Sequence, residues 1–163
     1  MLESTSVNAP ARPPAPEKAS QDQAIEISRG GRTTKLHVFV DLLGRPIVLH
    51  LTPGHHADIR AAPDLIAKAG PFRRLIADRA YDADPLRADL RAAGATPVIP
   101  GRRNRKTPIR HDRCHYQERW RIEATIGRMK DFRRVATRYD KLTRTFLYPG
   151  GNLRLLVVIE SRL

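Results

Sequence analysis

Two stretches of alternating apolar and polar residues, separated by a short turn, constrain the fold of this chain most strongly. They are Thr33–Asp41 (TTKLHVFVD) and Pro46–Thr52 (PIVLHLT), and the four residues between them include Gly44. Two such β-branched stretches around a short glycine-containing connection predict a β-hairpin. Pro53 and Gly54 follow directly and are expected to end it. A sheet that contains this hairpin is therefore the expected centre of the fold.

The segments after the hairpin alternate between helix and strand. Residues 58–69 carry apolar side chains at helical spacing, with Asp58 as the expected N-cap and Gly70 as the expected residue after the C-terminus. This order predicts an α/β fold, with helices packed on a mixed sheet. The other predicted elements are strands at Met1–Val7, Arg74–Asp78 and Thr96–Ile99 and a helix at Pro85–Ala93.

Two segments lack any apolar pattern and are expected to be loops. Residues 8–27 contain Pro10, Pro13, Pro14 and Pro16, which exclude a helix or a central strand. Ser28–Arg32 is expected to be a flexible basic turn, and residues 101–113 a basic loop. A chain of 163 residues has room for one domain with its own core, so residues 1–163 are expected to form a single domain.

The positive charge is concentrated in the last third of the chain. The formal net charge is +13, of which residues 1–100 carry +2 and residues 101–163 carry +11. A surface of this kind favours a polyanionic partner, with nucleic acid first and an anionic membrane surface second. Arginine supplies most of the charge and can fork onto two phosphate oxygens.

The other bulk features indicate a soluble, cytoplasmic protein. Cys114 is the single cysteine, so the chain makes no intrachain disulfide. No N-terminal stretch resembles a signal peptide. The longest apolar run, Leu155–Ile159, is far too short to cross a bilayer.

A long helix is expected at His115–Arg134, which runs without proline. Ile122, Ile126 and Met129 form its apolar stripe. At about 100° per residue, Tyr116, Arg119, Glu123 and Lys130 fall within roughly an 80° arc beside that stripe. On a bare charged helix this arc is a solvated face with an Arg119–Glu123 pair. The alternative is a functional face, and the spacing Y-x2-R-x3-E-x6-K favours that alternative.

That spacing resembles the signature of the DDE transposases of the insertion-sequence-four and -five groups. Other blocks are similar to the same family in the same order, and together they cover nearly all of residues 1–148. They are SRGGRTTKLH (28–37), LTPG (51–54), LIADRAYD (75–82), TPVIPGRRNR (96–105) and FRRVATRYDK (132–141).

The resemblance implies an RNase H-like fold, with a mixed five-stranded sheet flanked by helices and its first strand at the chain start. It also implies three catalytic and metal-holding carboxylates. Carried over by position, these are Glu3 in the first strand, Asp78 at the end of the strand 74–78 and Glu123 on the long helix.

The implied activity is DNA strand cleavage and strand transfer in transposition. The implied cofactor is Mg²⁺ or Mn²⁺ in a two-metal site, which activates the attacking oxygen and stabilises the leaving one. Arg119 and Lys130 are expected to contact DNA phosphates or to steady the site, and Tyr116 to hydrogen-bond a carboxylate or a phosphate. The implied partners are DNA at the transposon ends and target, and a second copy or the full-length transposase; no membrane partner is expected.

Two departures from the family pattern open an alternative. Glu3 stands where the family has Asp, and a misplacement of about 1 Å in such a site can cost on the order of 100-fold in rate. The N-terminal DNA-binding domain that family members usually carry is not expected ahead of residue 1, which would fit a frameshift product or a decayed fragment. The alternative is therefore a catalytically impaired remnant, which binds DNA non-specifically or interferes with full-length transposase. A third hypothesis, a general basic nucleic-acid binder, does not explain why Glu123 lies on the Tyr/Arg/Lys face.

Three further groups of residues are possible functional sites. His111, Cys114 and His115 lack the fourth ligand that a structural zinc site needs. Asp82 is expected to be a turn or cap residue, or a support of the metal site. The basic loop is either solvated or in contact with phosphates, and phosphate contact, which does not read sequence, is the preferred reading. Its candidate DNA-binding residues are Arg102, Arg103, Arg105 and Lys106.

Overall fold

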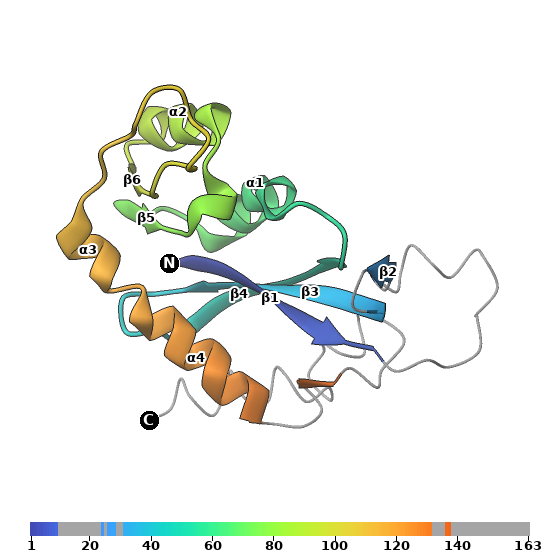
Figure 1. Ribbon diagram of the computed structural model, residues 1–163. Helices are drawn as coiled ribbons and strands as arrows, with labels where there is room; N and C mark the ends of the chain where they lie inside the picture. The colour runs from blue at the N-terminus through green and yellow to red at the C-terminus, as the bar shows by residue number, and fades with distance from the viewer. Residues whose placement is uncertain (10–23, 25, 29–30, 132–135, 138–163) are drawn as a thin grey trace.

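The described part of the chain is a sheet with helices on both faces (Figure 1). The computed structural model describes residues 1–9, 24, 26–28, 31–131 and 136–137. The apolar stretch 146–163 lies outside these residues. Among the helices that the structure describes, none is long and apolar enough to cross a membrane.

The longest strand, β3 (Gly31–Val40), organises the larger sheet. It pairs antiparallel with β1 (Leu2–Asn8), with β2 (Glu26–Ser28) and with β4 (Pro46–Pro53). The predicted hairpin is therefore present as β3 and β4. The strand β2 was not predicted, because its three residues are too few to show an alternating pattern. It pairs with the start of β3, so part of the predicted loop 8–27 and basic turn 28–32 is a hairpin arm.

A second, two-stranded sheet consists of β5 (Arg74–Ile76) and β6 (Thr96–Val98), which are parallel. An isolated parallel bridge between Leu2 and Ala77 joins it to β1. The described sheets thus have four and two strands, whereas one five-stranded sheet was expected. Both β5 and β6 end sooner than predicted, because the pairing between them ends at Ile76 and Val98. Beyond Ile76, Ala77 forms the isolated bridge with Leu2.

Strand alternation divides the core between the two faces of the sheet. Leu2, Phe39, Leu75 and Ala77 pack with α1 (Asp58–Ala69) and α2 (Asp84–Ala92) on one face. The opposite face packs on α4 (Trp120–Asp131), and Figure 1 shows this helix crossing there. The buried residues of this second cluster include Val38, Leu36, Ile76, Ile122, Ile126 and Met129.

The helix α1 has the predicted bounds but not the predicted cap. Ala57 is its N-cap and makes no side-chain cap hydrogen bond, while Asp58 is the first helical residue. The Asp58 carboxylate instead accepts a hydrogen bond from the Nζ of Lys35 on β3 at 3.0 Å. Asp58 therefore forms a tertiary ion pair and does not cap the helix. Gly70 ends the helix with a φ of 73°, as its position predicts.

The predicted long helix 115–134 is in fact two helices, α3 (Arg113–Gln117) and α4. Glu118 and Arg119 lie in a turn between them. There the Glu118 N–H donates to His115 O and the Arg119 N–H to Tyr116 O, which are three-residue rather than four-residue steps. A 3₁₀-type turn narrows the helix and redirects its axis. Helical periodicity alone gave no sign of this break.

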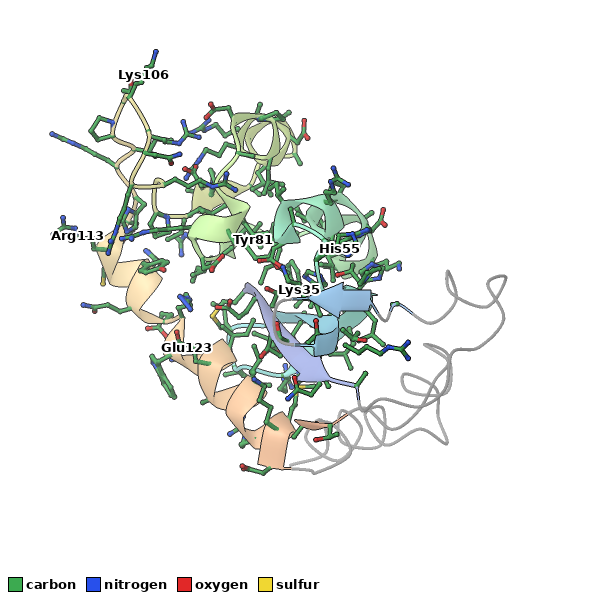
Figure 2. All side chains as sticks on the ribbon, turned by 45° about the vertical axis from the view of Figure 1, so that its right-hand side comes forward. Lys35, His55, Tyr81, Lys106, Arg113 and Glu123 are labelled. Atoms are coloured by element: carbon green, nitrogen blue, oxygen red, sulfur yellow. The ribbon has the colours of Figure 1, made fainter. Side chains whose placement is uncertain are left out.

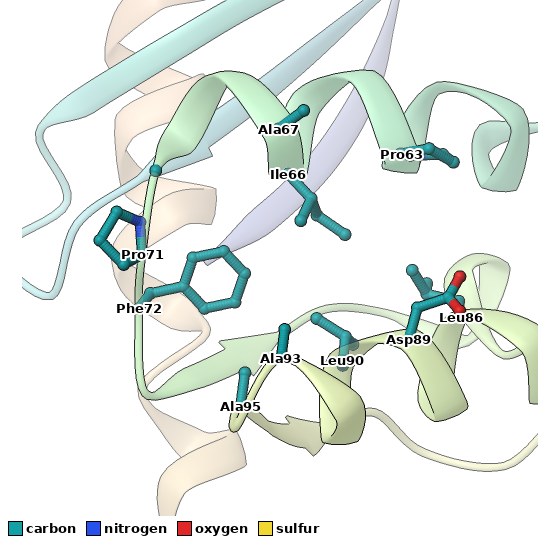
Figure 3. A pocket seen from close by; sticks show the side chains of 11 residues that line it. Pro63, Ile66, Ala67, Pro71, Phe72, Leu86, Asp89, Leu90, Ala93 and Ala95 are labelled. Atoms are coloured by element: carbon teal, nitrogen blue, oxygen red, sulfur yellow. The ribbon is translucent and has the colours of Figure 1, made fainter.

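The two helices α1 and α2 leave a pocket of about 340 Å³ between them (Figure 3). Its walls are apolar, with Ile66, Phe72 and Leu90 facing in and Asp89 at its rim. It lies in the layer of α1 and α2, whereas α4 covers the other face of the sheet.

Candidate functional site

The first two candidate carboxylates lie at neighbouring positions, Glu3 on β1 and Asp78 two residues beyond the end of β5. The Leu2–Ala77 bridge aligns β1 with the end of β5, so Glu3 and Asp78 each follow a paired residue. Leu2 and Ala77 point into the α1 and α2 layer. Because side chains alternate along a strand, Glu3 and Asp78 share the opposite face, which α4 covers.

Arg119 joins Glu3 to the third carboxylate. Its Nη2 lies 2.8 Å from Glu3 Oε2 and 2.8 Å from Glu123 Oε1, and its Nε lies 3.2 Å from the same oxygen of Glu3. The two carboxylate oxygens are therefore no farther apart than twice 2.8 Å. The structure thus brings Glu3 and Glu123 together, from positions 120 residues apart in the sequence, around one guanidinium.

Tyr116 holds the other side of this guanidinium. Arg119 Nη1 donates to the Tyr116 hydroxyl at 3.3 Å, and the guanidinium carbon lies 5.9 Å from the centre of the Tyr116 ring. Tyr116 therefore contacts Arg119 and not a carboxylate. Lys130, the fourth residue of the signature, is exposed near the end of α4, and no hydrogen bond or ion pair links it to a described residue.

Glu3 is the buried member of this group, with 9 % of its surface exposed, whereas the Glu123 side chain is 56 % exposed. Burial raises the pKa of Glu3 to about 7; Arg119 opposes the rise, while Asp78 and Glu123 add to it. The effect of Asp78 on this pKa is consistent with its place beside Glu3. Three acids and one guanidinium therefore share one electrostatic environment.

Asp78 has a backbone partner of its own. Its Oδ1 accepts from the Ala80 N–H at 2.8 Å and so caps the short 3₁₀ helix η2 (Arg79–Tyr81). The cap fixes the direction of the chain as it leaves β5. A carboxylate that accepts one hydrogen bond keeps lone pairs for a cation.

The chemistry of these side chains suits a hard divalent cation. Carboxylate oxygens are the ligands that Mg²⁺ and Mn²⁺ prefer, and a cationic group already lies between Glu3 and Glu123. Within the described ranges, no group of three His, Cys, Asp or Glu side chains is close enough to hold a metal ion as they stand. The donor set fits, and Arg119 occupies the position between two of its members.

Asp82, four residues beyond Asp78, is the centre of a buried ion-pair network. Its side chain has no exposed surface and its two oxygens accept from Arg87 Nε at 2.9 Å and Arg105 Nε at 2.6 Å. The Arg102 N–H donates to it at 2.7 Å. Burial alone would raise the pKa of Asp82, but these hydrogen bonds outweigh it and lower the pKa to about 2.

This network attaches the basic loop to the body of the protein. Arg105 also reaches Asp84 at 2.6 Å, and the Arg102 side chain donates to the carbonyls of Arg79 and Ala80. Sequence reasoning missed the pairing of Arg105 with Asp82, because the two are 23 residues apart and no pattern links them.

The candidate DNA-binding residues of the loop therefore differ in availability. Arg102 and Arg105 are bound to the protein itself. Arg103 and Lys106 are exposed and form no hydrogen bond or ion pair with any described residue. Figure 2 shows Lys106 projecting from the outer end of the loop.

The three residues considered for zinc are arranged around α3. His115 Nδ1 lies 2.5 Å from Asp112 Oδ2, and its Nε2 lies 2.7 Å from Arg74 Nη1. The His111 ring packs edge-on against Tyr116, and Cys114 is exposed. Both ring nitrogens of His115 are thus engaged with side chains of the protein.

The structure is a mixed α/β fold in which Glu3 and Glu123 meet at Arg119, and Asp78 follows the bridge to β1. Comparison with known proteins specifies the family. The model of the family described as "Transposase DDE domain" matches residues 2–148. The chain belongs to this family, whose members generally use a divalent metal ion and act in DNA transposition.

Two curated relatives agree. A Brucella ovis protein named as a transposase for insertion sequence element IS6501 is 39 % identical over 119 residues, which cover 71 % of this chain and 89 % of that protein. A Burkholderia cepacia protein named as a transposase for insertion sequence element IS402 is 30 % identical over 119 residues. That match covers 66 % of this chain and 54 % of that protein, so the chain spans about half of the second relative. No solved structure matches the chain.

Proposed function

We propose that this chain is the catalytic domain of an insertion-sequence transposase, which cleaves DNA strands and transfers them in a metal-dependent reaction. The observation that carries the proposal is the meeting of Glu3 and Glu123 at Arg119, with Asp78 beside Glu3. A plain nucleic-acid binder has no use for three acids grouped on the face that also bears its cations.

An RNase H-like sheet is part of this proposal. The strand β3 is antiparallel to β1 and β4, and β5 and β6 are parallel to each other. If the Leu2–Ala77 bridge continues the larger sheet, the order becomes β4, β3, β1, β5, β6. That order is a mixed sheet of five strands with helices on both faces, and the short β2 is a sixth strand paired with the start of β3.

In the proposed reaction Glu3, Asp78 and Glu123 hold Mg²⁺ or Mn²⁺. Bound there, the cations supply activation of a water or 3′-hydroxyl nucleophile and charge stabilisation at the leaving oxygen. The chain's own contribution is to position the DNA. Arg119 and Tyr116 lie at the carboxylates, and Lys130, Arg103 and Lys106 offer cations to the phosphates on either side.

The proposed partner is therefore DNA at transposon ends and target, with a second copy of this chain or a longer transposase completing end recognition. The relatives are bacterial, and we place the reaction in the bacterial cytoplasm, where the chromosome lies.

Mn²⁺-dependent nicking of supercoiled plasmid by the purified chain tests the proposal. We expect nicking in the wild type, and its loss in Glu123→Gln. Glu118→Gln is the matched control: Glu118 lies in the turn before α4 and pairs with Arg121 at 2.7 Å, away from the carboxylate group. Nicking that survives Glu123→Gln would overturn the assignment of Glu123.

One observation favours a second candidate, a catalytically impaired remnant that binds DNA. Glu3 carries the longer side chain where the family has Asp, and both of its oxygens are engaged, Oε2 by Arg119 and Oε1 by the Ser4 N–H at 3.3 Å. Catalytic groups must hold their geometry to within about 0.5 Å. DNA binding without nicking in the wild type, restored by Glu3→Asp, would identify the remnant; binding without nicking in both would point the same way.

A further inference from the structure

We propose that Arg119 closes the carboxylate site in the free protein, and that a DNA phosphate and a divalent cation open it together. This inference rests on the proposed function and specifies how the site is controlled. The Arg119 guanidinium would exchange Glu3 and Glu123 for a phosphate, while the cation takes its place between the carboxylates.

The first argument is the position of the guanidinium. One nitrogen, Nη2, lies 2.8 Å from an oxygen of Glu3 and 2.8 Å from an oxygen of Glu123. A cation held by both carboxylates needs those same oxygens and the space between them. Arg119 and a shared metal ion therefore exclude each other, in keeping with the lack of a ready three-ligand group among the described residues.

The second argument is the cost of removing Arg119 alone. Glu3 is 9 % exposed, and a buried ionised carboxylate that loses its partner is strongly destabilised. A divalent cation that replaces Arg119 on Glu3 removes this cost. The same reasoning applies to the cation, because it cannot bind both acids until Arg119 has left.

The third argument concerns where the guanidinium goes. Arginine forks onto phosphate oxygens as well as onto carboxylates, so a DNA phosphate is a chemically equivalent partner. Tyr116 contacts Arg119 by its hydroxyl at 3.3 Å and by its ring at 5.9 Å, and neither contact depends on Glu3 or Glu123. Tyr116 can therefore retain the guanidinium beside the site during the exchange.

The fourth argument is the place of Arg119 in the backbone. It lies in the turn between α3 and α4, and its carbonyl starts α4 by accepting from the N–H groups of Ile122 and Glu123. A change of side-chain rotamer at Arg119 leaves these bonds intact. The exchange thus requires no rearrangement of α4, which carries Glu123.

The consequence is coupling between metal and DNA. Each ligand removes the obstacle to the other, so each must raise the affinity of the other by the same factor. Coupling of this kind commonly amounts to about 5- to 150-fold.

Mn²⁺ binding, followed by the loss of the electron paramagnetic resonance signal of free Mn²⁺, tests the proposal without any measurement of cleavage. The probes are Mn²⁺ alone and Mn²⁺ with a 20-base-pair duplex of arbitrary sequence, corrected for Mn²⁺ bound by the duplex itself. We expect the duplex to tighten Mn²⁺ binding of the wild type by on the order of tenfold. Arg119→Gln is expected to bind Mn²⁺ tightly without DNA and to show no further tightening.

Arg113→Gln is the matched control. It removes the same charge six residues earlier, where Arg113 is exposed on α3 and forms no hydrogen bond or ion pair with a described residue. It should behave as the wild type, because a general loss of positive charge is not the cause. Equal Mn²⁺ affinities of Arg119→Gln and Arg113→Gln would overturn the proposal.

A second measurement covers the case in which Arg119→Gln does not fold. Duplex affinity of the wild type is measured with and without Mn²⁺ at matched ionic strength, beside Glu123→Gln. We expect Mn²⁺ to raise the wild-type affinity by the same factor as in the first experiment and to leave Glu123→Gln unchanged. A wild-type factor of one would overturn the proposal.

The outcomes separate this inference from the proposed function. If no version binds Mn²⁺ with or without DNA, the metal site and the closure by Arg119 both fall. If Mn²⁺ binds and Glu123→Gln abolishes binding, but Arg119→Gln matches Arg113→Gln, the metal site stands and only the closure falls.

Discussion

The hydroxyl of Thr125, in the middle of α4, donates a 2.7 Å hydrogen bond to the backbone carbonyl of Gly44 at the turn of the β3–β4 hairpin. Thr125 is fully buried, and Arg121 donates to Leu42 O in the same turn. These contacts attach the helix that bears Glu123 to the central strand of the sheet. The geometry of the candidate site therefore depends on the close approach of Gly44 to α4.

Substitution of Gly44 by Ala is expected to loosen this attachment. Gly44 has a φ of 83°, and a Cβ there would lie 3.1 Å from Thr125 Oγ1. The left-handed backbone costs a non-glycine residue about 1–2 kcal/mol. Crowding against α4 adds about 1 kcal/mol or more. Urea denaturation would measure the loss of unfolding free energy.

Gly94→Ala is the control for Gly44→Ala. Gly94 has a similar φ of 75°, but nothing lies within 4 Å of its added Cβ. It should show only the backbone cost. Equal losses in the two variants would mean that the contact with Thr125 contributes nothing.

Asp82→Asn is expected to destabilise the fold and release the basic loop. The substitution removes a buried charge and leaves Arg87, which is 2 % exposed, without its ion-pair partner. Breaking one side of a buried ion pair costs about 3–5 kcal/mol. Denaturation measures this cost, and hydrogen exchange at the Arg102 N–H, which donates to Asp82, reports the release of the loop.

The comparison for this change is Asp84→Asn, since Asp84 shares Arg105 with Asp82 but its side chain is 75 % exposed. Exposed pairs contribute little to stability. We expect near-wild-type unfolding and unchanged exchange at Arg102. A loss as large as that of Asp82→Asn would show that Arg105, rather than burial of Asp82, holds the loop.

Neutralising the exposed loop cations should change the salt dependence of DNA binding. Arg103→Gln and Lys106→Gln each remove a cation that has no described protein partner. If each contacts one phosphate, the slope of log affinity against log salt concentration falls by about 0.9 per residue. Fluorescence anisotropy with a labelled duplex, at several salt concentrations, measures the slope.

Arg105→Gln should behave differently from these two variants. Its guanidinium is committed to Asp82 and Asp84, so we expect a lower Tm and little change in the salt slope, measured where the variant is folded. If the slope of log affinity against log salt concentration fell by about one unit without a change in Tm, Arg105 would be a phosphate contact after all.

The contribution of His37 to stability should fall in mild acid. Burial lowers its pKa to about 4, from an ordinary 6.5, and its ring lies 2.8 Å from Thr52 Oγ1 and 3.3 Å from the Tyr81 hydroxyl. The unfolded chain takes up a proton near pH 6.5, whereas the folded chain does so only near pH 4. The contribution of His37 is therefore complete above pH 6.5 and is lost as the pH falls toward 4.

His37→Gln should lose less stability than the wild type as the pH falls, as measured by urea denaturation from pH 7 to pH 4. The exposed His55, changed to Gln, is the control and should leave the slope as in the wild type. Parallel profiles for wild type and His37→Gln would show that another group produces the acid loss.

Much of the fold and of the site could be predicted from local patterns. Alternation along β3 and β4, apolar spacing along α1 and the spacing of Tyr116, Arg119, Glu123 and Lys130 depend on neighbours a few residues apart. Such patterns survive in a sequence because each element must bury one face. The family resemblance added Glu3 and Asp78, which no local pattern would have joined.

The sequence by itself thus determined the elements, the class of fold, the family and the basic character of the C-terminal third. Only the tertiary structure decided that the long helix turns at Arg119, that Arg119 bridges Glu3 and Glu123, and that Arg105 is committed to Asp82. The physical reason is that these contacts join residues up to 116 positions apart. Their energies depend on burial and on distances that exist only once the sheet and α4 have packed together.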